Sequence, residues 1–353
     1  MQIGLYDPYL DDGGGGEKYM MTIAETLSQN HNVHVFWNNK KDVAFVAKRF
    51  GLDLSRVQIL PNIFSSHISL VKRFFATQKY DAMILLSDGS IPLVGAKKLF
   101  LHVQQPLEKL QIYSVFDKIK LHKVTAFFCN SAYTQKYIAE KFHVASRIIY
   151  PPVDLCPEKA KKENIILHVG RFRSVEGRDY KKQSVMIQVF KKMVDNGFSG
   201  WRFVIGKSVL EKDITAFEQM KNLAKGYPIT FLINQSNKNL WQIYAKAKIY
   251  WHASGYGEDL SLHPELAEHF GISTVEAMSA GAVPIVINAG GQKEIVQNAE
   301  NGFLWDSLEA LADKTNLLAK NVKLWERLSD NAKETAKKFS KEKFSENITK
   351  LIQ

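Results

Sequence analysis

Tyr150-Pro151-Pro152-Val153-Asp154 divides the sequence into two series of expected strands and helices. The two prolines lack backbone donors and stiffen the chain, and the polar, basic segment 158–164 follows them. Such a stretch is typical of a linker between domains. We therefore predict an N-terminal domain over 1–152, a C-terminal domain over 153–335 and a C-terminal helix over 336–353. In one arrangement that we consider, this C-terminal helix packs against the N-terminal domain.

Short apolar runs alternate with segments of helical spacing on both sides of this linker. The expected strands are 2–6, 33–37, 81–86, 98–103 and 125–130 before it, and 165–170, 202–206, 230–233, 249–252, 283–287 and 303–305 after it. Strands that alternate with helices predict parallel sheets covered by helices on both faces. We therefore predict an α/β protein with two doubly wound domains, and ligands beyond the carboxyl ends of the strands.

The composition agrees with two domains and limits the partners. The chain has 353 residues, and 45% of them are hydrophobic, so each half can bury a core. The formal net charge is +11, which favours anionic partners such as nucleotide diphosphates or phospholipid head groups. A merely solvated basic surface is the alternative. No helix-turn-helix or aromatic RNA-binding signature is present, so we do not expect nucleic acid as a partner.

The sequence predicts a cytoplasmic location. Residues 1–6 form a short strand without a basic, apolar leader, and no run reaches the roughly 18 to 20 apolar residues that cross a bilayer. Segments 63–75 and 109–123 mix apolar and basic residues. One expectation is that they lie as amphipathic helices on anionic lipid at the inner face of the membrane. The alternative is that they are core helices whose basic face is exposed to solvent.

Glu268-His269-Phe270-Gly271-Ile272-Ser273-Thr274-Val275-Glu276 is the most informative segment for chemistry. Ser273 and Glu276 have the spacing of a capping box, which predicts a helix start here. A helix start offers free N–H groups and a positive dipole end, which suit a phosphate. Glu276 could then bind a ribose diol, and Glu268 could bind sugar hydroxyls. The alternative is that Glu276 only caps its helix and Glu268 is an ordinary loop acid.

This segment resembles the Glu-x7-Glu signature of glycosyltransferase family 4, whose members are retaining enzymes of the GT-B fold. Segments 280–286, 290–296 and 301–303 also fit that family. The family usually has Glu-Gly-Phe-Gly, whereas this chain has His269 in place of the first glycine. Trp251-His252-Ala253, followed by an insertion over 255–266, is similar to the mannosyltransferase branch that acts on lipid-linked oligosaccharides.

The resemblance covers nearly the whole chain and implies a fold and an activity. The fold would be two Rossmann-like domains whose parallel sheets face a central cleft, with the acceptor bound by the N-terminal domain. The activity would be transfer of a hexose, with mannose favoured, from a nucleotide diphosphate sugar to a glycan or lipid-linked hydroxyl. The donor is a substrate, so we expect no cofactor. Without an Asp-x-Asp near a strand end, we also expect no metal.

The resemblance assigns Arg171 and Lys181 to the donor diphosphate, because two fixed cations can stabilise a leaving diphosphate. Lys182 competes with Lys181 for this role, and we prefer Lys181 for its spacing to Phe190. The loop over 174–180 is longer than the family pattern.

Two features of the N-terminal half also match the family. Gly13 to Gly16, followed by Glu17, resembles its glycine-rich loop and is not a dinucleotide fingerprint, since Lys18 stands where a third glycine would be needed. His102 ends an expected strand and matches a histidine that faces the transferred sugar, although a lone histidine is more often structural.

The predicted site is therefore the following set. The catalytic residues are Glu268, His102, Arg171 and Lys181, and the donor-binding residues are Gly14, Gly15, Arg171, Lys181, Glu268, Phe270, Gly271, Ile272 and Glu276. Two rival functions stay open at this point. A sugar phosphorylase or nucleotide-sugar epimerase would use a similar cleft, and a non-enzymatic basic protein would bind polyanions with steep salt dependence.

Overall fold

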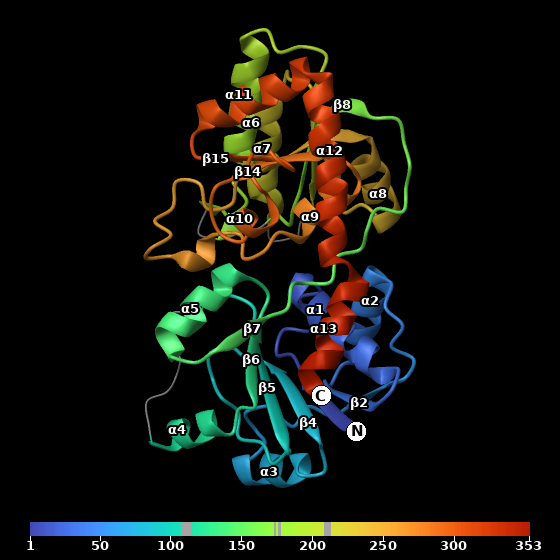
Figure 1. The fold of residues 1–353 in the computed structure, drawn as a ribbon, viewed down its shortest axis with the longest axis vertical. Coiled ribbons are helices and arrows are strands. Elements are labelled where there is room, and N and C mark those ends of the chain that lie inside the picture. The colour runs from blue at the N-terminus through green and yellow to red at the C-terminus, as the bar shows by residue number, and fades with distance from the viewer. Residues whose placement is uncertain (107–114, 173, 176–177, 208–212) are drawn as a thin grey trace. The chain divides into compact units, whose positions relative to one another are not determined.

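The computed structural model describes residues 1–106, 115–172, 174–175, 178–207 and 213–353, and these form two compact units (Figure 1). Unit 1 comprises Met1–Pro152 and Lys341–Gln353, and unit 2 comprises Val153–Ser340. The end of unit 2 lies after the predicted end at 335. Backbone pairing explains the difference, because Val153 forms a parallel bridge with Ser340 and its N–H donates to Phe339 O.

Unit 1 is built on a parallel sheet with the strand order β3-β2-β1-β4-β5-β6-β7. Its strands are β1 Gln2–Tyr6, β2 Asn32–Phe36, β3 Val57–Leu60, β4 Ala82–Leu86, β5 Lys98–Val103, β6 Ala126–Cys129 and β7 Ser146–Ile148. Strand β4 is apolar and buried throughout, and β1 and β5 are buried except at terminal residues, as expected for a parallel sheet with helices on both faces.

All helices of unit 1 except the last lie between these strands in the sequence. The helices are α1 Gly15–Ser28, α2 Lys40–Phe50, α3 Leu70–Thr77, α4 Val115–His122, α5 Ala132–Phe142 and the C-terminal α13 Lys341–Ile352. Figure 1 shows α13 beside α1. Phe344 of α13 packs edge-on against Tyr19 of α1, and Ile348 and Leu351 join the same buried core. The last helix of the sequence therefore completes the first unit.

Unit 2 repeats this plan with the strand order β12-β11-β8-β13-β14-β15, in which every pair is parallel. Its strands are β8 Glu163–Val169, β11 Arg202–Lys207, β12 Ile229–Ile233, β13 Ala247–His252, β14 Val283–Ile287 and β15 Phe303–Trp305. A small antiparallel pair, β9 Ser174–Val175 and β10 Arg178–Asp179, lies between β8 and the next helix.

The helices of unit 2 are α6 Gln183–Asp195, α7 Ile214–Ala224, α8 Asn237–Lys246, α9 Ile272–Ser279, α10 Gln292–Ile295, α11 Leu308–Lys320 and α12 Val322–Ala336. The 3-10 helices η2 Pro264–Leu266 and η3 Lys337–Phe339 also belong to the described part of the unit. Trp251 of β13 is fully buried and packs against Phe190 of α6 and Phe203 of β11. The core of unit 2 is therefore independent of the core of unit 1.

The prediction of two parallel α/β sheets is confirmed, and β3, β7, β9 and β10 are strands that the sequence pattern did not indicate. The predicted helix over 63–75 is wrong in its first half. Ser69 caps α3 by accepting from Lys72 N, and the Arg73 guanidinium donates to Ile63 O and Phe64 O, which holds the preceding segment in a turn. Residues 109–114 of the second amphipathic segment lie outside the described residues.

Candidate functional site

Charged side chains gather at the carboxyl ends of β8 and β13 in unit 2. Arg171 follows β8 and is half-buried, and Lys181 precedes α6. Glu268 lies in the loop between β13 and α9. Its backbone carbonyl accepts from Gly291 N, and a side chain at position 291 would collide with His269 O at 2.3 Å. The pair Gly290-Gly291 therefore lets a second loop support the Glu268 backbone.

Lys181 and Glu268 form an ion pair within this group. Lys181 Nζ lies 2.6 Å from Glu268 Oε2, and their side chains are 29% and 19% exposed. Burial raises the pKa of the Glu268 carboxyl, but Lys181 and the hydrogen bond with His252 outweigh burial and hold this pKa well below its usual range. Glu268 is therefore a carboxylate, and it is not set up as a general acid.

His252 is a member of this group that sequence reasoning missed. It is the last residue of β13, is 1% exposed, and its Nε2 lies 3.0 Å from Glu268 Oε2. Burial lowers the pKa of the imidazole, so a neutral ring that donates from Nε2 fits this contact. Its position at the end of an expected strand and its place in Trp251-His252-Ala253 are the sequence signals that could have pointed to it.

His168 of β8 contacts the strand that carries His252. Its Nδ1 donates to Trp251 O at 2.9 Å, and burial followed by the nearby His252 lowers its pKa to about 3. The ring is therefore neutral at physiological pH. The centroids of the two imidazole rings lie 6.1 Å apart.

Lys182 is held differently from Lys181. Its Nζ forms an ion pair with Glu258, which belongs to the insertion over 255–266. Lys182 also has a φ of 53°, in the left-handed region that non-glycine residues seldom adopt. This backbone turn at the start of α6 sends the two consecutive lysines to two different glutamates. The insertion is thereby attached to the segment that carries Lys181.

Gly271 is the N-cap of α9, so the predicted capping box at Ser273 is wrong. The φ of Gly271 is 121°, and a Cβ there would meet Gln292 Nε2 at 2.5 Å. Helix α9 therefore begins at Ile272, one residue before Ser273, whose Oγ instead lies 2.8 Å from Tyr250 Oη. The side chain of Phe270 is buried against Phe339, so Phe270 can offer a ligand only its backbone.

Glu276 is the fifth of the eight residues of α9 and is half-buried. Its Oε2 accepts from Tyr244 Oη of α8 at 2.9 Å. Burial and the carboxylate raise the pKa of Tyr244 well above its usual range, so the phenol keeps its proton. Glu276 is thus oriented by a neighbouring helix and does not cap its own.

In unit 1, His102 lies near the end of β5 in an aromatic stack. Its ring centroid is 4.1 Å from that of Tyr19 and 4.8 Å from that of Phe128, with nearly parallel planes. Nδ1 faces Phe128 O at 3.4 Å, and burial lowers the pKa to about 3. Among the described residues, Nε2 has no hydrogen-bond partner. His102 is therefore a neutral, fully buried ring.

The glycine-rich loop precedes α1, and Gly14 is the N-cap of that helix. The Gly14 N–H donates to Glu17 Oε2, so it is already engaged within the loop. Gly15 is exposed and begins the first turn of α1, whose N–H groups have no acceptor inside the helix. Asp7 is buried just beyond β1, and burial together with Glu17 raises its pKa to about 7.

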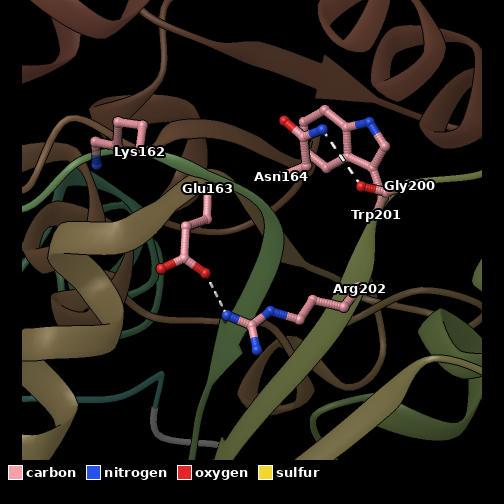
Figure 2. A pocket seen from close by; sticks show the side chains of 6 residues that line it. All are labelled: Lys162, Glu163, Asn164, Gly200, Trp201 and Arg202. Atoms are coloured by element: carbon pink, nitrogen blue, oxygen red, sulfur yellow. Dashed lines mark hydrogen bonds and ion pairs between the residues drawn. The ribbon is translucent and has the colours of Figure 1, made fainter.

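A surface hollow lies at the opposite end of the unit 2 sheet and does not coincide with these residues (Figure 2). Lys162, Glu163, Asn164, Gly200, Trp201 and Arg202 line it, and Figure 2 shows the Glu163–Arg202 ion pair. The seven residues of β8 separate its two ends by about 20 Å. Within the described ranges, no group of three or more His, Cys, Asp or Glu could hold a metal ion. Metal independence stays a prediction.

The family described as glycosyl transferases group 1 matches residues 157–335. A GDP-Man:Man(3)GlcNAc(2)-PP-Dol alpha-1,2-mannosyltransferase of Dictyostelium discoideum is 25% identical and covers 100% of this chain and 84% of its own length. The protein of that name from Xenopus tropicalis is 24% identical, over 98% and 85% of the two chains.

Solved structures resemble the whole chain. Anabaena HepE in complex with UDP has a TM-score of 0.72 at 16% identity and covers 99% of both chains. A sucrose-phosphate synthase from Thermosynechococcus elongatus has a TM-score of 0.69 at 16% identity, over 99% and 98% of the chains. These likenesses concern the fold and confirm the predicted GT-B class.

Proposed function

We propose, because this chain belongs to the family of glycosyl transferases group 1, that it transfers mannose from GDP-mannose to a hydroxyl of a lipid-linked glycan. Membership in this family makes the protein a retaining hexosyltransferase, as the sequence resemblance implied. The observation that carries the choice of donor and acceptor is the similarity to named mannosyltransferases over the full chain. The UDP-bound neighbours are 16% identical, and we infer no donor base from them.

The donor would bind mainly to unit 2. Arg171 and Lys181 would hold the diphosphate, Glu276 the ribose, and Glu268 the sugar hydroxyls. The Lys181–Glu268 ion pair supports these roles, because it brings together residues that are 87 positions apart in the sequence. Backbone N–H groups of Gly271 and Ile272 at the start of α9 would add donors to the phosphates, as helix starts do. The neutral ring of His102 and the loop at Gly14 and Gly15 are proposed for the sugar side from the resemblance alone.

The proposed reaction follows from these groups. The bond between the anomeric carbon and the donor phosphate oxygen breaks, and the acceptor oxygen forms the new bond on the same face, so the configuration is retained. The proton of the acceptor hydroxyl passes to the departing phosphate. Arg171 and Lys181 would stabilise the negative charge that grows on the diphosphate as it leaves. Glu268 is held as a carboxylate by Lys181 and His252, and we assign it to hydroxyl binding.

We also propose that α3 and α4 touch an anionic membrane surface, where a lipid-linked acceptor resides. Val71 and Phe75 of α3 and Val115 of α4 are 65%, 63% and 76% exposed. No acidic residue occurs over 54–80, whereas Lys72 is exposed there. The two helices lie at the same end of unit 1 (Figure 1), and Lys123 Nζ, just after α4, is 5.3 Å from the Phe74 ring. Exposed apolar groups beside cations fit anionic lipid head groups.

Vesicle sedimentation tests this membrane contact. The wild-type protein should sediment with phosphatidylglycerol vesicles and not with neutral phosphatidylcholine vesicles. Val71→Glu combined with Phe75→Glu should abolish the sedimentation, whereas Leu317→Glu, at an exposed position of α11, should not. Equal sedimentation of both variants would refute a contact through α3. In the described ranges, no helix combines the length and apolar character that crossing a bilayer requires.

Donor binding is the measurement that tests the proposed function. Titration calorimetry with GDP, UDP, ADP, CDP and dTDP, without added metal, should show binding of GDP. Turnover of GDP-mannose should then require an added lipid-linked glycan. A phosphorylase would need phosphate and an epimerase would need no acceptor, so product analysis separates these rivals. Failure to bind any nucleoside diphosphate would overturn the proposal.

A further inference from the structure

Lys207 is a buried lysine that the proposed function does not use. It is the last residue of β11 and is 4% exposed. Strand β11 lies beside β8, and Gly170 N, just after β8, donates to Gly206 O at 3.0 Å. Lys207 therefore sits at the carboxyl end of the sheet, next to the segment that leads into Arg171. A lysine is rarely buried without a specific set of partners.

Three aromatic rings surround the Lys207 ammonium. Nζ lies 4.5 Å from the ring centroid of Phe172, 4.2 Å from that of Phe217 and 4.9 Å from that of Phe231. These rings come from the loop after β8, from α7 and from β12. Ring faces attract a cation at such distances. The cage thus joins three separate elements through one charge.

Lys207 also fixes the start of α6. Its Nζ donates to Gln183 Oε1 at 3.1 Å, and Gln183 is the fully buried first residue of that helix. Asp179 also stabilises the start of α6, because its Oδ2 accepts from both the N–H and the hydroxyl of Ser184. Burial lowers the pKa of Lys207 to about 7, while Asp179 acts to raise it.

Two of the partners of Lys207 lie close in sequence to the two cations that are proposed to hold the diphosphate. Phe172 is the residue after Arg171, and Gln183 is two residues after Lys181. We propose that Lys207 is a positioning residue for the donor diphosphate, which acts by holding these two segments at a fixed separation. The inference rests on the proposed function, because it requires that Arg171 and Lys181 bind a diphosphate. It adds a residue that touches no phosphate itself.

Calorimetry with GDP and GMP tests this inference. Lys207→Met keeps the aliphatic stem and removes the charge and the hydrogen bond. It should raise the Kd for GDP about tenfold and the Kd for GMP about twofold or less, because only GDP spans both cations. Lys191→Met is the matched control. Lys191 lies on α6 and has one ring contact, with Tyr227, and one carbonyl contact, with Leu223, away from the cations. Its GDP affinity should equal that of the wild type.

A second variant keeps the test decisive if Lys207→Met does not fold. Phe217→Leu removes one ring of the cage, together with its edge-on contact with the Phe172 ring, and leaves the Lys207–Gln183 hydrogen bond in place. It should raise the Kd for GDP selectively by a smaller factor. Equal losses for GDP and GMP, or no loss for either variant, would overturn the positioning role and leave the proposed function intact. Absence of GDP and UDP binding by the wild-type protein would overturn the proposed function and this inference together. If the wild type binds UDP instead, UDP and UMP replace the two probes.

Discussion

The carboxyl ends of the two sheets carry different kinds of groups, although both sheets are parallel and similarly covered. In unit 2 the neutral rings of His168 and His252 lie beside charged groups that have partners, since Lys181 and Lys182 each pair with a glutamate. In unit 1 two buried groups have lost their charge or stand close to losing it, since His102 has a pKa of about 3 and Asp7 a pKa of about 7. Partners stabilise a charged form, whereas burial without a partner favours the neutral form.

This difference fits two kinds of ligand. A paired and partly exposed cation such as Lys181 can exchange its carboxylate partner for a phosphate. A neutral buried ring such as His102 can offer a hydrogen bond or packing to an uncharged sugar, but it does not attract a diphosphate. Substitutions of single groups in each unit test this difference.

Asp7→Asn should change the pH dependence of stability in unit 1. The pKa of Asp7 is raised from 3.8 to about 7 in the folded protein, so between these values the folded state holds a proton that the unfolded state has lost. Stability from this group is present below pH 4 and is lost as the pH rises through 7, by up to about 4 kcal/mol. The asparagine resembles the neutral acid, so the variant should unfold at a higher temperature than wild type at pH 8. Thermal unfolding at pH 5 and pH 8 measures this, and an equal difference at both values would contradict it.

Glu268→Gln should inactivate the site in unit 2 while the fold survives. The substitution removes the charge that Lys181 and His252 hold in place, and loss of such a preorganised group lowers kcat by about 100- to 1,000-fold. Initial rates with saturating donor measure the effect. Glu300→Gln, at an exposed turn, is the matched control and should retain full activity. Activity within threefold of wild type for Glu268→Gln would remove Glu268 from the site.

His102→Phe separates the functional and structural roles of the stacked ring. Phenylalanine has a similar size and keeps the stack with Tyr19 and Phe128, so the free energy of unfolding should change by less than about 1.5 kcal/mol. If the imidazole faces the sugar, kcat/KM should fall about tenfold, the equivalent of one hydrogen bond. Unchanged kcat/KM in a stable variant would make His102 a packing residue only.

Glu258→Gln should have the smallest effect and should decide between the two lysines. The ion pair with Lys182 is mostly shielded, and its loss should lower the free energy of unfolding by about 1 kcal/mol. The Lys181–Glu268 pair remains, so the Kd for GDP should not change. A tenfold weaker affinity for GDP would instead place Lys182 and the insertion in the diphosphate site. Chemical unfolding and calorimetry on the same variant give both values.

The local helix signals of the sequence were sufficient to predict the helix that follows Glu268, but not the residue at which it begins. Ser273 and Glu276 have the spacing of a capping box, yet α9 begins one residue earlier, at a glycine with a φ of 121°. The backbone there is set by Gln292, which would collide with a Cβ on Gly271. A contact with a residue 21 positions away therefore decided where the helix begins. A prediction from local helix propensity does not include such a contact.

The sequence by itself determined the α/β class, the two series of strands and the carboxyl-end loops in which Arg171, Lys181 and Glu268 lie. These features depend on residue periodicity and on prolines and glycines, which act over a few neighbouring positions. Only the tertiary structure decided that Lys181 pairs with Glu268, that His252 supports it and that three rings enclose Lys207. Those contacts depend on strand order, because β8, β11 and β13 are neighbours in the sheet although they are far apart in the sequence.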